Sequence, residues 1–210
     1  MKNGESHWSK KQVLQKQALQ TQGELFLPSV TEALSKLGYL NPVHQRLSKQ
    51  VDVETYQGLT RATNNKLDPL MIKWEISADI YCDLTSLGQE IKAHKTLNSS
   101  QIKAQNFINI SPQILADKSL IITVLNKNYQ LTLLVMPYCT QGSLAEYLKQ
   151  SLTDKQKQQL IFKVAQLISN LHSYGWLHND IKPSNILINY DHCLLFTDFA
   201  LAGLIDSGSK

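Results

Sequence analysis

The sequence predicts an α+β fold of two lobes that share a cleft. Between residues 48 and 137, runs rich in Val, Ile, Leu, Thr and Tyr surround one helical segment, which is typical of a small, mostly antiparallel lobe. From about residue 142 the apolar residues recur with helical spacing, which predicts a second, helical lobe. With 210 residues, 42% of them hydrophobic, the chain has enough apolar material for both.

Charge and hydropathy argue against two classes of partner. The formal net charge is +4, and most of it comes from lysines in the first 22 residues, so the remainder is nearly neutral. We therefore expect no nucleic-acid partner. No run of the sequence approaches the ~18 to 20 apolar residues that span a bilayer, and we expect no membrane partner.

Cysteine spacing bears on the compartment. Cys82, Cys139 and Cys193 lie far apart and form no C-x-x-C pair, which favours neither a disulfide framework nor a zinc site. They are interpreted as reduced thiols, and we expect a cytoplasmic protein.

The first 47 residues are expected to form an N-terminal arm and a short helix. Residues 1–22 are rich in Gln and Lys and predict a mobile arm. In "PSVTEALSKLGYLNP", Ser29 and Glu32 have the spacing of a capping box, and Gly38 is a helix-ending residue.

The small lobe is expected to contain four strands and one helix. The strands are "KQVDVETYQGLTRAT", "LDPLMIKWEIS" and the two arms of "SLIITVLNKNYQLTLLVMPY", whose turn is predicted at Asn126 and Asn128. The segment "LTSLGQEIKAHKTLNSS" predicts the helix.

The large lobe is expected to be helical after "CTQGS". Its main helix is predicted to begin at a Thr153–Gln156 capping box and to end at Gly175. Its apolar residues recur on one face: Leu160, Ile161, Val164, Leu167, Ile168 and Leu171.

Polar residues with chemical potential gather in "HNDIKPSNILI", residues 178–188. Asp180 stands two residues before Lys182 and five before Asn185, and Asp198 follows the apolar strand "CLLF". Such a group could accept a proton, steady a transferring phosphoryl group and bind Mg²⁺ through oxygen ligands.

This order of motifs resembles the catalytic loop and metal-binding segment of eukaryotic-like (Hanks-type) serine/threonine protein kinases. The resemblance implies that Asp180 and Lys182 are catalytic and that Asn185 and Asp198 bind Mg²⁺. A Lys followed by Pro after the Asp is typical of protein kinases rather than of kinase-like enzymes that act on small molecules.

The resemblance also implies an ATP site. In "LMIKWE", Lys73 corresponds to the lysine that contacts the α- and β-phosphates, and Glu90 in "GQEIKAHKTL" to its ion-pair partner. In "LLVMPYCTQGSL", the carbonyl of Pro137 and the N–H of Cys139 would face adenine, with Met136 guarding the pocket behind it. Leu187 would form the floor.

Four features depart from the family pattern. Gly58 is the single glycine of the expected phosphate loop, where Asp52 and Glu54 replace glycines and predict weak nucleotide affinity. Ala200 replaces the glycine after Asp-Phe, and Asn179 replaces the arginine that pairs with an activation-loop phosphate. The chain ends soon after Asp198, so we expect an incomplete C-terminal helical lobe.

The resulting prediction is a two-lobed kinase-like fold with an arm at 1–47, a small lobe and hinge at 48–141, and a partial large lobe at 142–210. The expected function is ATP-dependent phosphoryl transfer to Ser or Thr of a protein. Two alternatives stay open: a non-catalytic pseudokinase or interaction module, and a compact small-molecule kinase. The exposed stripe of the main helix predicts a partner chain or self-association.

Overall fold

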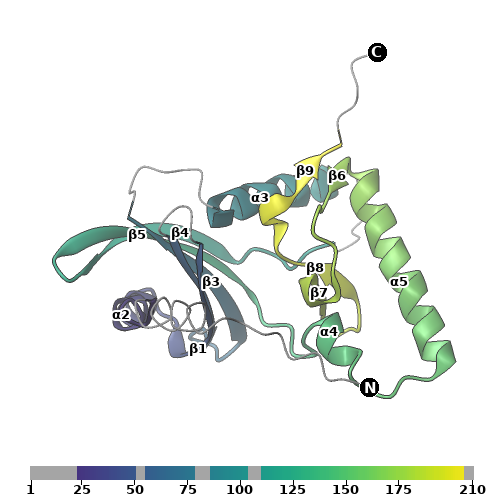
Figure 1. Ribbon diagram of the computed structural model, residues 1–210, viewed down its shortest axis with the longest axis horizontal. Helices are drawn as coiled ribbons and strands as arrows, with labels where there is room; N and C mark the ends of the chain where they lie inside the picture. The colour runs from purple at the N-terminus through teal and green to yellow at the C-terminus, as the bar shows by residue number, and fades with distance from the viewer. Residues whose placement is uncertain (1–22, 51–54, 79–85, 104–109, 206–210) are drawn as a thin grey trace, which may run out of the picture.

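The computed structural model describes residues 23–50, 55–78, 86–103 and 110–205. These residues form a β-rich lobe followed by a lobe of helices and short strands (Figure 1). The fold is the α+β, two-lobed arrangement that the sequence predicts. Residues 1–22 and 51–54, the latter including Asp52 and Glu54, lie outside the described residues, as does Cys82.

The small lobe is built on a five-stranded antiparallel sheet. Its strands are β1 (Leu40–Gln50), β2 (Thr55–Thr63), β3 (Pro69–Ser77), β4 (Ala116–Val124) and β5 (Lys127–Pro137), in the order β1-β2-β3-β5-β4. β1 begins at Leu40, so the expected limit at residue 47 falls inside this strand. The ladder between β1 and β2 is irregular between Leu40 and Val43, around Pro42, and a proline is tolerated at such a bulge.

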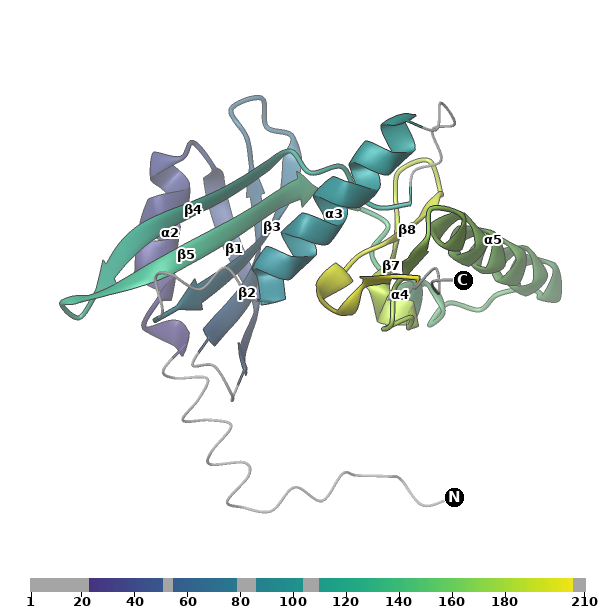
Figure 2. The same ribbon diagram turned by 90° about the horizontal axis from the view of Figure 1, so that it is seen from above.

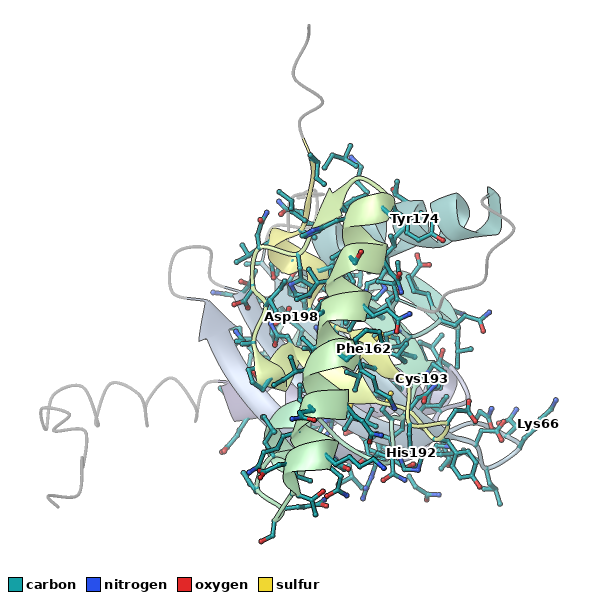
Figure 3. The ribbon with its side chains drawn as sticks, turned by 90° about the vertical axis from the view of Figure 1, so that its right-hand side faces the viewer. Lys66, Phe162, Tyr174, His192, Cys193 and Asp198 are labelled. Atoms are coloured by element: carbon teal, nitrogen blue, oxygen red, sulfur yellow. The ribbon has the colours of Figure 1, made fainter. Side chains whose placement is uncertain are left out.

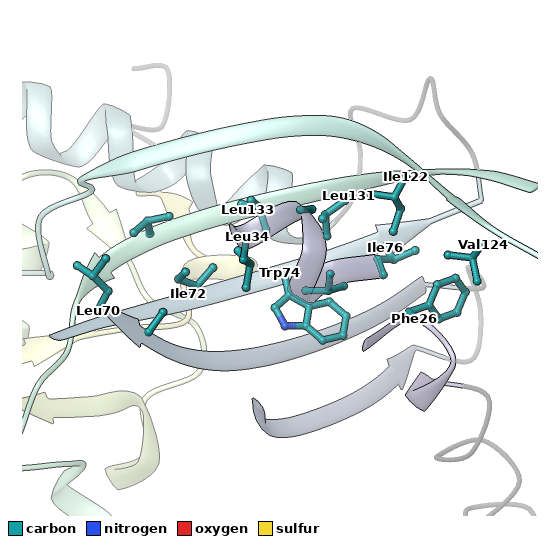
Figure 4. Packing of buried hydrophobic residues seen from close by; sticks show 14 residues of the cluster. Phe26, Leu34, Leu70, Ile72, Trp74, Ile76, Ile122, Val124, Leu131 and Leu133 are labelled. Carbon is teal, nitrogen blue, oxygen red and sulfur yellow. The ribbon is translucent and has the colours of Figure 1, made fainter. Parts of the chain in front are cut away.

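Helix α2 (Leu27–Lys36) covers one face of the sheet. Phe26, Val30 and Leu34 pack there against alternate residues of β3 and β5, with Trp74 at the centre (Figure 4). His44 of β1 links helix and sheet, because its ring nitrogens lie 2.9 Å from the Thr31 hydroxyl and 2.7 Å from the Thr60 hydroxyl. Helix α2 therefore belongs to the core of the small lobe.

The predicted cap of this helix is wrong at one end and confirmed at the other. The helix begins at Leu27 after Phe26, with no side-chain cap, and Glu32 pairs with Lys36 instead of forming a capping box with Ser29. Proline fits the first helical turn, so Pro28 lets the helix start earlier. Gly38 has a φ of +84°, and Tyr39 N–H donates to the Leu34 carbonyl, which ends the helix as predicted.

Helix α3 (Ser86–Lys103) lies on the opposite face of the sheet, between the sheet and the large lobe (Figure 2). Leu87 and Ile91 pack against Leu134 and Met136 of β5. The sheet is thus a layer between α2 and α3, and the side chains of β3 and β5 alternate between its two faces.

The hairpin between β4 and β5 turns at Leu125 and Asn126, which both have positive φ. The prediction was right for Asn126, whereas Asn128 lies in β5 and accepts a hydrogen bond from Thr123. A two-residue turn of this hand matches the twist of the paired strands.

The described part of the large lobe contains two α-helices and two pairs of short antiparallel strands. They are α4 (Leu144–Tyr147), α5 (Asp154–Ser173), β6 (Trp176–Leu177) paired with β9 (Gly203–Leu204), and β7 (Ile186–Ile188) paired with β8 (Leu194–Phe196). The Thr153–Gln156 capping box of α5 is confirmed. Within the described residues, no helix combines the length and the apolar character that a membrane span requires.

The apolar residues of α5 do not all face one core. Leu167 and Leu171 are buried against Trp176 and Phe196, while Leu160, Val164 and Ile168 are partly buried. Ile161 and Phe162 are each 69% exposed. Phe162 lies on the outer side of the helix (Figure 3). Ile161 therefore departs from the single buried stripe that the spacing suggests.

Candidate active site

A cleft of about 370 Å³ lies between the two lobes, within the ~300 to 1,000 Å³ that small-molecule sites usually have. Strands β2 and β3, helix α3, the β5–α4 connection and the 183–198 region all contribute to its walls. Seven predicted site residues line it: Lys73, Glu90, Pro137, Cys139, Asn185, Leu187 and Asp198.

Lys73 ties three elements together at the inner end of this cleft. Its Nζ lies 2.8 and 2.9 Å from the two carboxylate oxygens of Glu90 on α3, and 3.4 Å from Asp198 Oδ1. The Asp198 N–H also donates to Glu90 Oε1, at 3.2 Å. Residues from β3, α3 and the segment after β8 are thus joined across the two lobes.

The charges of this group stabilise one another. Burial raises the pKa of Glu90, but the Lys73 ammonium and the neighbouring His94 outweigh that effect and hold the pKa at about 2. Burial lowers the pKa of Lys73, while Glu90 and Asp198 outweigh it, so this pKa is raised. Both groups are therefore charged near neutral pH.

His178 fixes the loop that carries Asp180. Its ring is buried, Nε2 lies 3.0 Å from the Thr197 carbonyl, and the Asp180 N–H donates to Nδ1 at 3.3 Å. One neutral tautomer, with the proton on Nε2, satisfies both contacts. Burial lowers the pKa of His178, and the hydrogen bond to Thr197 opposes this in part.

Lys182 and Asn185 both donate hydrogen bonds to the carboxylate of Asp180. Lys182 Nζ lies 2.6 Å and Asn185 Nδ2 lies 2.9 Å from Asp180 Oδ2. The hydrogen bond from Lys182 is the main cause of the lowered pKa of Asp180. The Asp180 carboxylate is therefore ionised and oriented from two sides.

The donor set around Asn185 and Asp198 fits Mg²⁺. Asn185 is buried just before β7, and its amide nitrogen bonds Asp180, which leaves Oδ1 as the atom available to a cation. Asp198 follows β8, and Thr197 N–H donates to the Asn185 carbonyl at 3.0 Å, so the two residues are neighbours. An amide oxygen and a carboxylate are hard ligands of the kind Mg²⁺ prefers.

The hinge presents its backbone to the cleft. Tyr138 N–H donates to the Pro69 carbonyl of β3 at 3.0 Å, and because a trans peptide points C=O opposite to the next N–H, the Pro137 carbonyl is turned away from β3. Leu187 lies below the hinge, because Ile188 N–H bonds the Gly142 carbonyl and Leu187 bridges Ser143.

The departures from the motif pattern have local explanations. Ala200 lies in a 3₁₀ turn (Phe199–Leu201) and has no positive φ, so this turn does not need glycine. Asn179 has a φ of +60°, which asparagine tolerates, and its amide donates to the Leu201 carbonyl at 3.0 Å. Asn179 thus holds the segment after Asp198 directly.

Sequence reasoning missed two buried polar groups near Glu90. His94 is fully buried against Phe199, its Nε2 lies 3.7 Å from Glu90 Oε1, and neither ring nitrogen has a hydrogen-bond partner among the described residues. The i,i+4 spacing from Glu90 was the available signal. The second group is Glu75 of β3, whose partners come from β2 and α3 and left no sequence signal.

Comparisons with known proteins agree with this geometry. Residues 72–210 match the protein kinase domain family. The chain is 28% identical over 160 residues to the maternal embryonic leucine zipper kinase of Xenopus laevis, covering 75% of this chain and 23% of that protein. It is 32% identical over 85 residues to the serine/threonine-protein kinase ppk6 of Schizosaccharomyces pombe, covering 40% and 11% respectively.

A third relative is an Aurora kinase of Eremothecium gossypii, 32% identical over 79 residues that cover 37% of this chain and 22% of that protein. Each match covers less than a quarter of the relative's own length. The family match extends over more than half of this chain. It begins within β3, just before Lys73, and includes α3, the hinge and the Asp180–Asp198 region. The chain therefore belongs to the protein kinase domain family.

Proposed function

We propose that the protein transfers the γ-phosphoryl group of ATP to serine or threonine residues of protein substrates. The observation that carries this proposal is the Lys73–Glu90–Asp198 group, in which one ammonium contacts carboxylates from α3 and from the segment after β8. This arrangement places a partly buried cation in the wall of a cleft, where it can hold phosphate oxygens.

The nucleotide would occupy the cleft with its base at the hinge. The Pro137 carbonyl and the Cys139 N–H would bind adenine, Leu187 would support its lower face, and Lys73 would bind the α- and β-phosphates. Glu90 orients the Lys73 ammonium. Mg²⁺ held by Asn185 and Asp198 would neutralise charge on the phosphates.

Asp180 would act on the protein substrate. Its carboxylate accepts the hydroxyl proton while the hydroxyl oxygen bonds the γ-phosphorus and the bond from that phosphorus to the ADP oxygen breaks. Lys182, 2.6 Å from Asp180 Oδ2, would steady the γ-phosphoryl charge. The lowered pKa of Asp180 keeps this residue ionised, and Asn185 keeps it oriented.

One observation favours the pseudokinase alternative. Gly58 faces Trp74, whose indole fills the space of a β-carbon, so its lack of a side chain serves strand packing and does not by itself indicate a phosphate loop. Asp52 and Glu54 precede it in the sequence. Two carboxylates close to a triphosphate would weaken nucleotide binding.

The test measures binding and transfer separately. Thermal shifts with ATP, with and without Mg²⁺, report binding, and labelled ATP with a generic basic protein, a sugar or an aminoglycoside reports transfer. Lys73→Met and Asp198→Asn should abolish the metal-dependent shift, and Asp180→Asn should abolish transfer while keeping the shift. Asp191→Asn, in the exposed turn before β8, is the matched control.

Transfer to the basic protein that disappears in Asp180→Asn supports the proposal. A wild-type shift without any transfer favours the pseudokinase, and transfer to the small molecules alone favours the compact small-molecule kinase.

The proposal also includes a cytoplasmic setting, which the free thiols of Cys139 and Cys193 support. It further includes self-association through the outer side of α5, which the exposure of Ile161 and Phe162 supports.

A further inference from the structure

Strand β3 directs two polar side chains toward α3. Side chains alternate along a strand, so Ile72, Trp74 and Ile76 enter the core beneath α2, whereas Lys73 and Glu75 leave the opposite face. Lys73 reaches Glu90, as described above. Glu75 is 1% exposed and is one of the few charged residues that are buried in the described chain.

The carboxyl group of Glu75 lies at the N-terminus of α3. Its Oε2 accepts hydrogen bonds from the Leu87 N–H at 3.3 Å and from the Ser86 hydroxyl at 3.0 Å, and it is also contacted by the side-chain amide of Gln57. Ser86 and Leu87 are the first two residues of the helix. The N–H groups of a first turn lack acceptors within their own helix, and the helix dipole favours a negative group there.

The carboxyl group of Glu75, a residue of β3, thus caps the N-terminus of α3. A cap usually comes from the residue just before the helix. Here the acceptor comes from β3, and Gln57 of β2 contacts both Glu75 and Ser86, so two strands and the helix meet at one point. We propose that Glu75 is a positioning residue: it anchors the N-terminus of α3 to the sheet and thereby holds Glu90 against Lys73.

The geometry explains why two contacts act together. Glu90 lies about one helical turn beyond Ser86, so β3 contacts α3 at two successive turns through Lys73 and Glu75. A rotation or sliding of α3 that breaks one contact strains the other. The neighbouring apolar contacts of Leu87 and Ile91 with β5 are non-directional and do not fix the rotation of the helix as hydrogen bonds do.

The same carboxyl group is costly for the fold. Its Oε1 is buried and has no hydrogen-bond partner among the described residues. A buried polar atom without a partner lowers stability, and loss of Oε2 would leave the Ser86 hydroxyl and the Leu87 N–H without this acceptor. Glu75→Gln keeps the acceptor, so comparing it with Glu75→Leu isolates the contact with α3.

The test compares Glu75→Gln with Glu75→Leu in the full chain. Gln keeps an oxygen that accepts from Ser86 and Leu87, and Leu removes it. Loss of a helix cap costs ~0.5 to 2 kcal/mol, which is a factor of roughly 2 to 30. In Glu75→Leu, amide hydrogen exchange in the first turns of α3 should accelerate by about that factor. Glu75→Gln should resemble the wild type.

The kinetic consequence rests on the proposed phosphoryl transfer. If α3 leaves its position more often, the fraction of molecules with a formed Lys73–Glu90 pair falls, and the KM for ATP should rise by up to the same factor. The KM for the basic protein should stay unchanged. Glu32→Leu, on the exposed side of α2, is the control for loss of a glutamate.

Unchanged exchange in Glu75→Leu would overturn the proposal, and so would equal acceleration in the Gln and Leu variants. If Glu75→Leu does not fold, Ser86→Ala is measured by the same hydrogen exchange. This variant removes one donor to Glu75 Oε2 and should accelerate exchange by a smaller factor. Unchanged exchange in Ser86→Ala would then overturn the proposal. Should the wild type transfer no phosphate, the proposed function fails, and hydrogen exchange alone still decides the role of Glu75.

Discussion

Gly58 and Trp74 face each other across β2 and β3, and the indole of Trp74 occupies the place of a side chain on Gly58. A β-carbon at position 58 would lie 2.1 Å from Trp74 Cζ2, well inside the contact distance of two carbon atoms. The indole N–H donates to the Thr60 hydroxyl at 3.0 Å, which fixes the ring in this position. The glycine and the tryptophan therefore form one packing unit.

Gly58→Ala should destabilise the small lobe. The added methyl group forces the Trp74 ring or the strand to move, and overpacking of this kind costs ~1 to 3 kcal/mol. Chemical denaturation would measure the loss in the free energy of unfolding. Gly203→Ala is the matched control, because a β-carbon there meets its nearest neighbour, Asn179 Nδ2, at 3.7 Å, an ordinary contact. Equal stability of both variants would contradict the packing described here.

His94→Leu should preserve or increase stability. The imidazole is fully buried with both nitrogens unpaired among the described residues, and leucine fills a similar volume without that cost, which is ~1 to 3 kcal/mol. The melting temperature should stay equal or rise, while the Lys73–Glu90 pair stays formed. A fall in melting temperature would mean that the contact between His94 and Glu90 contributes more than the unpaired nitrogens cost.

Stability should decrease in mildly acidic solution. Burial lowers the pKa of both His44 and His178, so both rings are neutral in the folded protein, whereas the unfolded chain titrates near the ordinary value of 6.5. Unfolding then takes up protons, and the free energy of unfolding is highest above about pH 6.5 and falls as the pH drops toward the folded-state pKa values.

The measurement is a series of denaturant melts from pH 8 to pH 5. His44→Gln can still bond both Thr31 and Thr60 but cannot titrate, and it should show a shallower loss than the wild type. Identical slopes in the two proteins would exclude His44 as a source of the acid sensitivity.

The outer side of α5 should promote self-association. Ile161 and Phe162 are both 69% exposed, and adjacent apolar side chains of this size favour contact with another surface. Phe162→Ser should shift the protein toward the monomer in sedimentation velocity experiments. Lys163→Ser, at the next exposed position, is the control. A wild-type protein that stays monomeric at all concentrations would refute this prediction.

The sequence predicted the residues that line the cleft better than the residues that hold them in position. Lys73, Glu90 and Asp198 are far apart in the chain, yet motif order alone placed each on the correct element, because a strand lysine, a helix glutamate and a post-strand aspartate follow separate local patterns. Glu75 could not be predicted. Strand alternation puts it on the same face as Lys73, but its burial depends on Gln57 and Ser86, which come from other elements.

The predicted starts of helices and strands were wrong where two local sequence signals competed. Ser29 and Glu32 have the spacing of a cap, but Pro28 is equally suited to a first helical turn, and burial of Phe26 and Val30 on the sheet decided the start of α2. β1 was not predicted as a strand of its own, because the expected first strand, "KQVDVETYQGLTRAT", includes only its last two residues. Pro42 interrupts the alternation of "LNPVHQRL", and pairing with β2 makes this segment a strand.

The burial of Trp74 has an optical consequence. Trp74 and Trp176 are both buried, the first in the core of the small lobe and the second in that of the large lobe. An indole shielded from water fluoresces at shorter wavelength than one in contact with it. Replacing one of these rings together with Trp8, the third tryptophan of the sequence, by phenylalanine would leave the emission of the other ring to report on its own lobe. The opening of the two lobes during denaturation can then be recorded separately without an added dye.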